Sequence, residues 1–173
     1  MRDKHLANKI TIFRVILVPF FLLFSYTRLK WLCFLIFIIA SASDLLDGYI
    51  ARHYNQISVF GKFMDPLADK ILVISAMCVF IEWKIMPAWA VAIVIFREFA
   101  ISGLRLIAAQ KNIVIAAANS GKIKTGATMV SIAVMLLFRD IRFLCVLGAG
   151  VIVATTIWSG TEYFIKNKKI FIE

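Results

Sequence analysis

Apolar segments of nearly equal length follow one another along this chain, with only short polar breaks between them. Each is close to the roughly 20 residues that an α-helix needs to cross a bilayer. Of the 173 residues, 62% are hydrophobic, well above the roughly 45–50% of a soluble domain. The sequence therefore predicts an all-α, polytopic membrane protein with six transmembrane helices in one bundle. The predicted spans are 8–27, 31–51, 62–82, 86–107, 120–138 and 142–165.

The breaks between the spans are too short to hold a second folded part, so we expect a single membrane domain over residues 1–173. No small-residue cleavage site follows the first apolar run, which predicts a retained span and not a signal peptide. The three cysteines are odd in number and lie inside apolar runs, a pattern that argues against a disulfide framework.

The formal net charge of +10 is spread between the apolar segments and forms no separate basic domain. This distribution indicates contact with the membrane surface and with phosphate-bearing ligands, and it argues against nucleic acid as a partner. Fourteen lysines and arginines fall on one side of the predicted spans and five on the other. The positive-inside rule then predicts that both termini face the cytoplasm.

A cluster of carboxylates lies where the second predicted span ends and the third begins. Asp44 and Asp47 are three residues apart, and Asp65 and Asp69 are four apart, so each pair falls on one face of its helix. Two antiparallel helices joined by a short loop would present all four to a common centre, on the cytoplasmic side. Neighbouring carboxylates need cations to stay ionised, and oxygen ligands suit Mg²⁺ or Mn²⁺.

Two other interpretations of these aspartates remain open. They could be ordinary interfacial charges and helix caps, although four of the ten acidic residues fall within this short stretch. They could also line a cation or proton pathway, since transporters place carboxylates inside their spans. A pathway predicts acids through the full depth of the bilayer, whereas the other spans hold only Glu98 and Glu162.

The cluster is part of a longer pattern, Asp-x2-Asp-Gly-x2-Ala-Arg-x8-Gly-x3-Asp-x3-Asp, which runs from Asp44 to Asp69. It resembles the signature of the CDP-alcohol phosphotransferases, with every position filled. The resemblance implies a six-helix membrane enzyme, often a homodimer, that carries two divalent cations per active site. This agrees with the number of spans predicted from hydropathy.

The resemblance also implies roles for individual residues. Asp69 would act as the general base for the acceptor alcohol and would share in metal binding. The stretch from Asn8 to Thr11 resembles an N-terminal element of the family that lies beside the cytidine site. The implied metal ligands are Asp44, Asp47, Asp65 and Asp69. The residues implied to bind CDP-diacylglycerol are Asn8, Thr11, Gly48, Arg52, Ser58 and Gly61.

Basic residues in the fourth and fifth spans bear on the acceptor. Arg97 and Arg105 lie two turns apart, and buried arginines need anionic partners. We expect Glu98 to satisfy at most one of them well. The surplus positive charge predicts an acceptor with its own phosphate, such as glycerol 3-phosphate. The candidate phosphate-binding residues are Arg97, Arg105, Lys122 and Lys124. Alternatively, the cations at the helix ends could snorkel to lipid headgroups.

The runs around these basic residues also resemble the bacterial members of the family that make phosphatidylglycerophosphate. This resemblance implies a multi-pass enzyme of the inner (plasma) membrane. The implied reaction transfers the phosphatidyl group of CDP-diacylglycerol to sn-glycerol 3-phosphate and releases CMP. A family member with another acceptor, in cardiolipin or phosphatidylinositol phosphate synthesis, is the enzymatic alternative, and a small cation transporter is the other. Small residues in the fifth span permit close packing, either inside the chain or between two copies.

Overall fold

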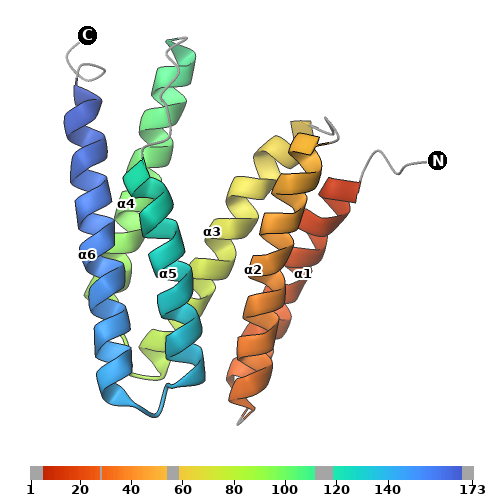
Figure 1. Cartoon of the computed structure of the whole chain (residues 1–173), viewed down its shortest axis with the longest axis vertical. Coiled ribbons are helices and arrows are strands. Elements are labelled where there is room, and N and C mark those ends of the chain that lie inside the picture. The colour runs from red at the N-terminus through yellow and green to blue at the C-terminus, as the bar shows by residue number, and fades with distance from the viewer. Residues whose placement is uncertain (1–5, 28, 54–58, 112–118, 169–173) are drawn as a thin grey trace. The chain divides into compact units, whose positions relative to one another are not determined.

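The computed structural model is all-helical over the residues that it describes, which are 6–27, 29–53, 59–111 and 119–168 (Figure 1). Within the helices, the side chains of residues 6–9, 30, 44–53, 59–66 and 69 lie outside the described part. The elements are α1 (Leu6–Ser25), α2 (Lys30–His53), α3 (Val59–Glu82), α4 (Ala88–Gln110), α5 (Asn119–Leu137) and α6 (Arg142–Lys166).

The six predicted helices are confirmed, and each lies where hydropathy placed it. The helix ends fall at the polar and turn-forming breaks of the sequence. Between α3 and α4, Lys84 adopts a left-handed φ of 59°, which ends the helical path. Pro87 follows as the N-cap of α4, with an extended backbone and a ring that cannot continue the preceding helix.

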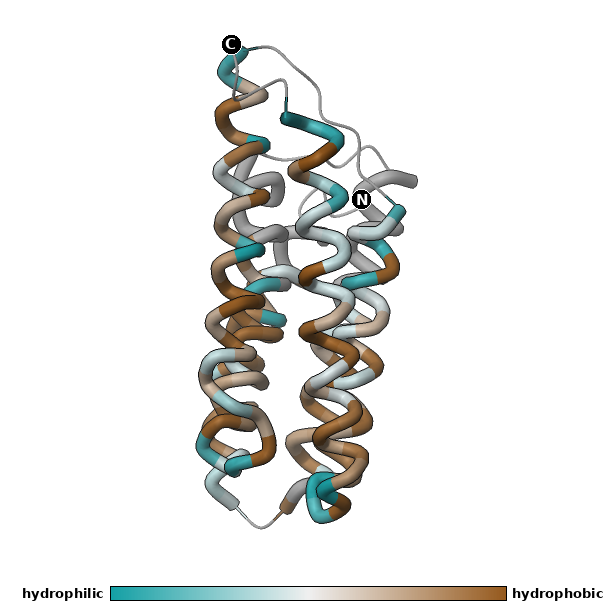
Figure 2. The backbone as a smooth tube through the Cα atoms, turned by 90° about the vertical axis from the view of Figure 1, so that its left-hand side faces the viewer, coloured by the Kyte–Doolittle hydropathy of each residue, from teal (hydrophilic) through white to brown (hydrophobic). Residues whose placement is uncertain are grey.

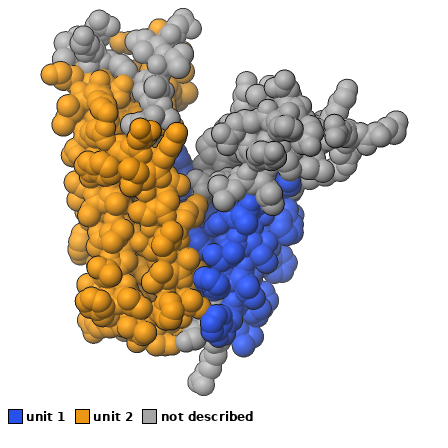
Figure 3. All heavy atoms as spheres, in the orientation of Figure 1, with its two compact units in different colours: residues 1–82 blue, residues 83–173 orange. Residues whose placement is uncertain are grey.

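The helices form two compact units, Met1–Glu82 and Trp83–Glu173 (Figure 3). In the first unit, α1 contacts both α2 and α3, and α2 contacts α3. Phe21, Phe37 and Phe80 are fully buried there. In the second unit, α6 contacts both α4 and α5. Val94 on α4 and Ile132 on α5 are fully buried in this unit.

Close approach between α5 and α6 depends on a missing side chain. A Cβ atom at Gly148 would lie 2.9 Å from Cγ and 3.0 Å from Sδ of Met135, which is fully buried on α5. The hydroxyl-bearing residues Thr128 and Ser131 are also buried on α5. Part of the small-residue run in α5 therefore serves an internal helix contact.

Gly148→Ala should destabilise the second unit, because the new methyl group must displace Met135. Overpacking of this kind costs about 1–3 kcal/mol, with the flexibility of methionine favouring the lower end. The melting temperature of the purified protein in detergent measures the effect. The matched control is Gly150→Ala on the same helix, where an added Cβ meets nothing within 4 Å. Equal melting temperatures for the two variants would contradict the packing argument.

Large apolar side chains cover much of the outer surface of individual helices. On α6, Val146, Leu147, Trp158 and Ile165 are all exposed. Hydrophobic residues recur along this helix, which lies beneath the C-terminus in Figure 2. Soluble monomers rarely expose contiguous apolar surface of this kind, so these faces suit lipid.

Among the described residues, α6 (Arg142–Lys166) alone is both long and apolar enough to cross a membrane by length and composition. Ile10–Ser25 and Trp31–Ser43 are shorter apolar stretches. Two other helices do not meet this test because of their polar content. The helix α4 carries three charged residues, and α5 begins with polar and basic residues. The six crossings therefore stay a prediction.

Candidate functional site

The acidic motif lies on α2 and α3. Asp44 and Asp47 fall near the end of α2, and Asp65 and Asp69 fall in the first half of α3, with both helices unbroken through these positions. The two helices contact each other. The backbone thus keeps the spacing that places each pair on one helix face. The side chains of all four lie outside the described residues.

No group of three or more possible metal-ligating side chains occurs in the rest of the chain that the structure describes. The side chains of the other residues that the family resemblance implies on these helices also lie outside the described part. Gly48 and Arg52 fall within α2 and Gly61 within α3, in the stretches whose side chains are not described, and Ser58 lies outside the described residues altogether.

On α1, the predicted cytidine element faces the interior of the first unit. Thr11 and Arg14, three residues apart, are both buried, with Arg14 0% exposed. The side chain of Asn8 lies outside the described part, although the residue belongs to α1. A guanidinium tolerates burial only among polar or anionic partners. Arg14 is therefore a buried cation of the first unit, a feature that its place in an apolar run did not reveal.

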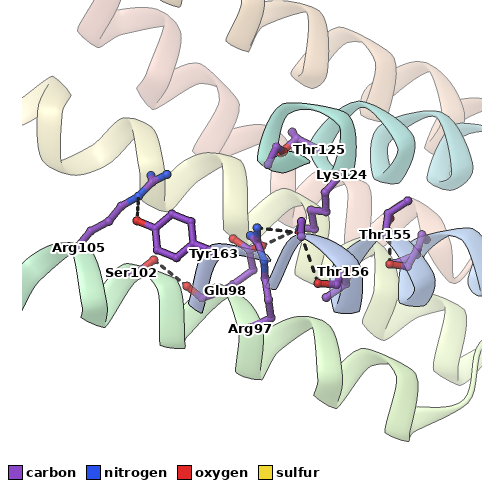
Figure 4. A network of polar contacts seen from close by, with 12 residues as sticks. Arg97, Glu98, Ser102, Arg105, Lys124, Thr125, Thr155, Thr156 and Tyr163 are labelled. Atoms are coloured by element: carbon purple, nitrogen blue, oxygen red, sulfur yellow. Dashed lines mark hydrogen bonds and ion pairs between the residues drawn. The ribbon is translucent and has the colours of Figure 1, made fainter. Parts of the chain in front are cut away.

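The second unit brings two of the four predicted acceptor residues, Arg97 and Lys124, together around Glu98 (Figure 4). Oε1 of Glu98 accepts a hydrogen bond of 2.8 Å from Nη1 of Arg97, its neighbour on α4. The same oxygen accepts 2.7 Å from Nζ of Lys124 on α5, whose side chain is 6% exposed. Arg97 also donates from Nη2 to the hydroxyl of Ser159 on α6, at 3.0 Å.

This arrangement agrees with the expectation that Glu98 satisfies at most one of the two arginines, because Glu98 pairs with Arg97 whereas Arg105 bonds to Tyr163. The same carboxylate oxygen also accepts from Lys124, a pairing that the sequence did not predict. Two cations and one anion leave a net charge of +1 in this cluster. The surplus positive charge that predicted an anionic acceptor is therefore present in the structure, although smaller than the sequence suggested.

Arg105 lies on the same helix, two turns further along. Its Nε donates 3.1 Å to the hydroxyl of Tyr163 on α6, and its guanidinium carbon lies 5.6 Å from the centre of that ring. Tyr163 is 3% exposed and packs with Ile101 and Leu104. The two terminal nitrogens of Arg105 make no hydrogen bond to another described residue. They can therefore donate charge-assisted hydrogen bonds to a phosphate.

Lys122 does not join this cluster in the described part of the chain. Its side chain is exposed, and it forms no ion pair with another described residue. The structure thus brings Arg97 and Lys124 together on Glu98 and places Arg105 against α6. The contacts from Ser159 and Tyr163 were missed, because α6 carries no motif beyond hydrophobicity and a basic end.

The family model of the CDP-alcohol phosphatidyltransferases matches residues 4–158. This match covers most of the chain, including the acidic motif on α2 and α3 and the basic residues of α4 and α5. The chain belongs to the CDP-alcohol phosphatidyltransferase family.

Several curated relatives are similar over nearly their whole length. The CDP-diacylglycerol–glycerol-3-phosphate 3-phosphatidyltransferase of Bacillus subtilis (strain 168) is 40% identical over 183 aligned residues, which cover 94% of this chain and 95% of the relative. The protein of the same name from Escherichia coli (strain K12) is 41% identical over 172 residues, with 92% of each chain covered. The Shigella flexneri relative shows the same identity and coverage.

Proposed function

We propose that the protein transfers the phosphatidyl group of CDP-diacylglycerol to sn-glycerol 3-phosphate, forming phosphatidylglycerophosphate and CMP. The observation that carries this proposal is the near full-length similarity to relatives named for that reaction. The net positive cluster around Glu98 supports the proposal independently, because an acceptor that carries a phosphate would balance the surplus charge.

The donor set of the acidic motif fits a divalent-metal site. Four carboxylates, two on each of two contacting helices, supply the hard oxygen ligands that Mg²⁺ and Mn²⁺ prefer. Two bound cations would neutralise the pyrophosphate and stabilise the attacking and leaving oxygens of the displacement. In this proposal the ligands are Asp44, Asp47, Asp65 and Asp69.

The remaining tasks, which are proton transfer and substrate binding, belong to side chains and backbone groups of the protein. Asp69 takes the proton from the attacking hydroxyl of glycerol 3-phosphate, which is the task of a general base. The hydroxyl oxygen then bonds to the phosphorus next to diacylglycerol, and the bond from that phosphorus to CMP breaks. The CDP moiety is held by Asn8, Thr11, Gly48, Arg52, Ser58 and Gly61. The phosphate of the acceptor is held by Arg97, Arg105, Lys122 and Lys124.

The cellular setting is part of the same proposal. We expect six crossings of the inner membrane, both termini and the site on the cytoplasmic side, one domain and a homodimer. The exposed apolar faces of the helices and the apolar α6 support a membrane location. The excess of basic residues on one side of the spans supports the orientation.

The deciding experiment measures CMP release by the purified protein from CDP-diacylglycerol in detergent micelles. We expect release only when a divalent cation and sn-glycerol 3-phosphate are both present. The acceptor panel should also contain phosphatidylglycerol and inositol phosphate, because these separate the other members of the family. Release with one of these and not with glycerol 3-phosphate would replace the proposed acceptor. No release with any acceptor would favour a transporter.

Arg105→Ala should raise KM for glycerol 3-phosphate, because each charge-assisted bond to a ligand is worth about 1.5–3 kcal/mol. The corresponding loss in kcat/KM is about ten- to a hundredfold, with little change in KM for CDP-diacylglycerol. Arg105 is the cleanest test, since removing Arg97 or Lys124 also disturbs the pairing of the half-buried Glu98.

The matched control for Arg105 is Lys111→Ala. Lys111 is an exposed cation just past the end of α4 and lies outside the cluster. Steady-state kinetics with each substrate varied in turn compare the two variants. Equal effects of Arg105→Ala on both Michaelis constants would assign Arg105 to topology or headgroup contact.

A further inference from the structure

The face of α6 that meets α4 is formed by Ser159, Gly160 and Tyr163, which fall within one helical turn of each other. Ser159 and Gly160 are buried, and so is Tyr163. All three contact an arginine of α4. Ser159 and Gly160 contact Arg97. Tyr163 contacts Arg105 (Figure 4). Arginine side chains have many rotamers, so a fixed guanidinium needs such supports.

Tyr163 constrains Arg105 in two ways. Its hydroxyl accepts the hydrogen bond from Nε, and its ring lies beneath the guanidinium at 5.6 Å. The ring is itself held by packing with Ile101 and Leu104. Binding Nε on this side directs the two terminal nitrogens away from Tyr163, where they can meet a ligand in the forked geometry that phosphate favours.

Gly160 has the corresponding effect on Arg97. A Cβ atom there would lie 3.3 Å from Cγ of Arg97, tighter than ordinary van der Waals contact. The absence of a side chain lets the stem of Arg97 pass close to α6, so that its guanidinium reaches both Glu98 and Ser159. A glycine at this position suits a close approach and not a turn, because it lies inside a continuous helix.

We infer that α6 positions the acceptor-binding arginines of α4, with Tyr163 as the positioning residue of Arg105 and Gly160 that of Arg97. The inference rests on the proposed function and deepens it, because it assigns part of the selectivity for a phosphorylated acceptor to a helix without a recognisable motif. Tyr163 acts through Arg105, and Gly160 acts through Arg97.

The test compares Tyr163→Phe, Arg105→Ala and the double variant. Tyr163→Phe keeps the ring and removes the hydroxyl, so KM for glycerol 3-phosphate should rise about three- to tenfold. KM for CDP-diacylglycerol should stay unchanged, which also shows that the variant is folded. The double variant should match Arg105→Ala alone, because a residue that acts only through Arg105 has no effect once Arg105 is gone.

Thr161→Ala is the matched control on the same helix. Thr161 is exposed, and its hydroxyl bonds only to carbonyl oxygens of α6 among the described residues. Both Michaelis constants should remain at the wild-type values. A normal KM for glycerol 3-phosphate in Tyr163→Phe, or additive effects in the double variant, would overturn the role of Tyr163.

Gly160→Ala provides an independent arm that stands even if Tyr163→Phe does not fold. It should raise KM for glycerol 3-phosphate several-fold, whereas Gly150→Ala, with open space around the added Cβ, should not. Equal constants for the two glycine variants would overturn the role of Gly160. An active wild-type enzyme with unaffected α6 variants refutes this inference alone. A wild-type protein that releases no CMP with glycerol 3-phosphate refutes the proposed function as well.

Discussion

Asp44→Asn, Asp47→Asn and Asp65→Asn should each lower kcat by at least about a hundredfold, because metal-ion stabilisation of a phosphoryl displacement is worth several kcal/mol. Each change removes one negative charge from a donor set of four while keeping the size of the side chain. The three positions lie on the contacting helices α2 and α3, so the loss should appear in all of them. CMP release at saturating divalent cation measures the effect.

The control for these variants is Asp140→Asn. Asp140 lies between α5 and α6, has a side chain that is 67% exposed and pairs with Arg139. This variant also loses one carboxylate charge, and its turnover should match the wild type because surface pairs contribute little. Near-normal turnover in any two of the three motif variants at saturating metal would remove the metal assignment from the acidic motif.

Asp69→Asn should differ from its neighbours by separating binding from chemistry. General base catalysis contributes about a hundred- to ten-thousandfold, so kcat should fall by that factor. The three remaining carboxylates still carry the charge to hold a cation, and we therefore expect measurable binding of CDP-diacylglycerol. Equilibrium binding of the nucleotide lipid to the variant, compared with single-turnover CMP release, measures the two effects separately.

Two results would revise the role of Asp69. Normal turnover of Asp69→Asn would remove this residue from the mechanism. Complete loss of nucleotide-lipid binding would make Asp69 a metal ligand first and leave the general base to another residue. Asp65→Asn is the natural comparison, because Asp65 lies one turn earlier on α3 and has a ligand role only in the proposal.

The helices could be predicted from the sequence because their signal is local. Apolar runs of membrane-spanning length, broken by residues such as Pro87, determine where α4 and the other helices begin and end. The acidic motif is also local, since it lies on the end of α2 and the start of α3, which follow one another in the sequence. Both features depend on residues near each other in the chain, and periodicity is sufficient to find them.

The contacts that join the basic cluster across different helices are not local and could not be predicted. Lys124 reaches Glu98 across 26 residues of sequence, and Arg105 reaches Tyr163 across 58. Nothing in the spacing of α6 distinguishes Tyr163 from the other aromatic residues of that helix. Packing decides which faces of α4, α5 and α6 meet. The pairing of these faces cannot be derived from a single sequence.

The adjacent pair of Arg97 and Glu98 has a consequence for biogenesis. Their hydrogen bond of 2.8 Å forms within α4 alone and needs no other helix. In the proposed six-span topology, α4 would enter the bilayer with two of its charges already paired, before α5 and α6 are synthesised. An unpaired ion in a nascent span is costly to insert. The pair would lower this barrier, and Lys124 would later meet a partner that is already in place.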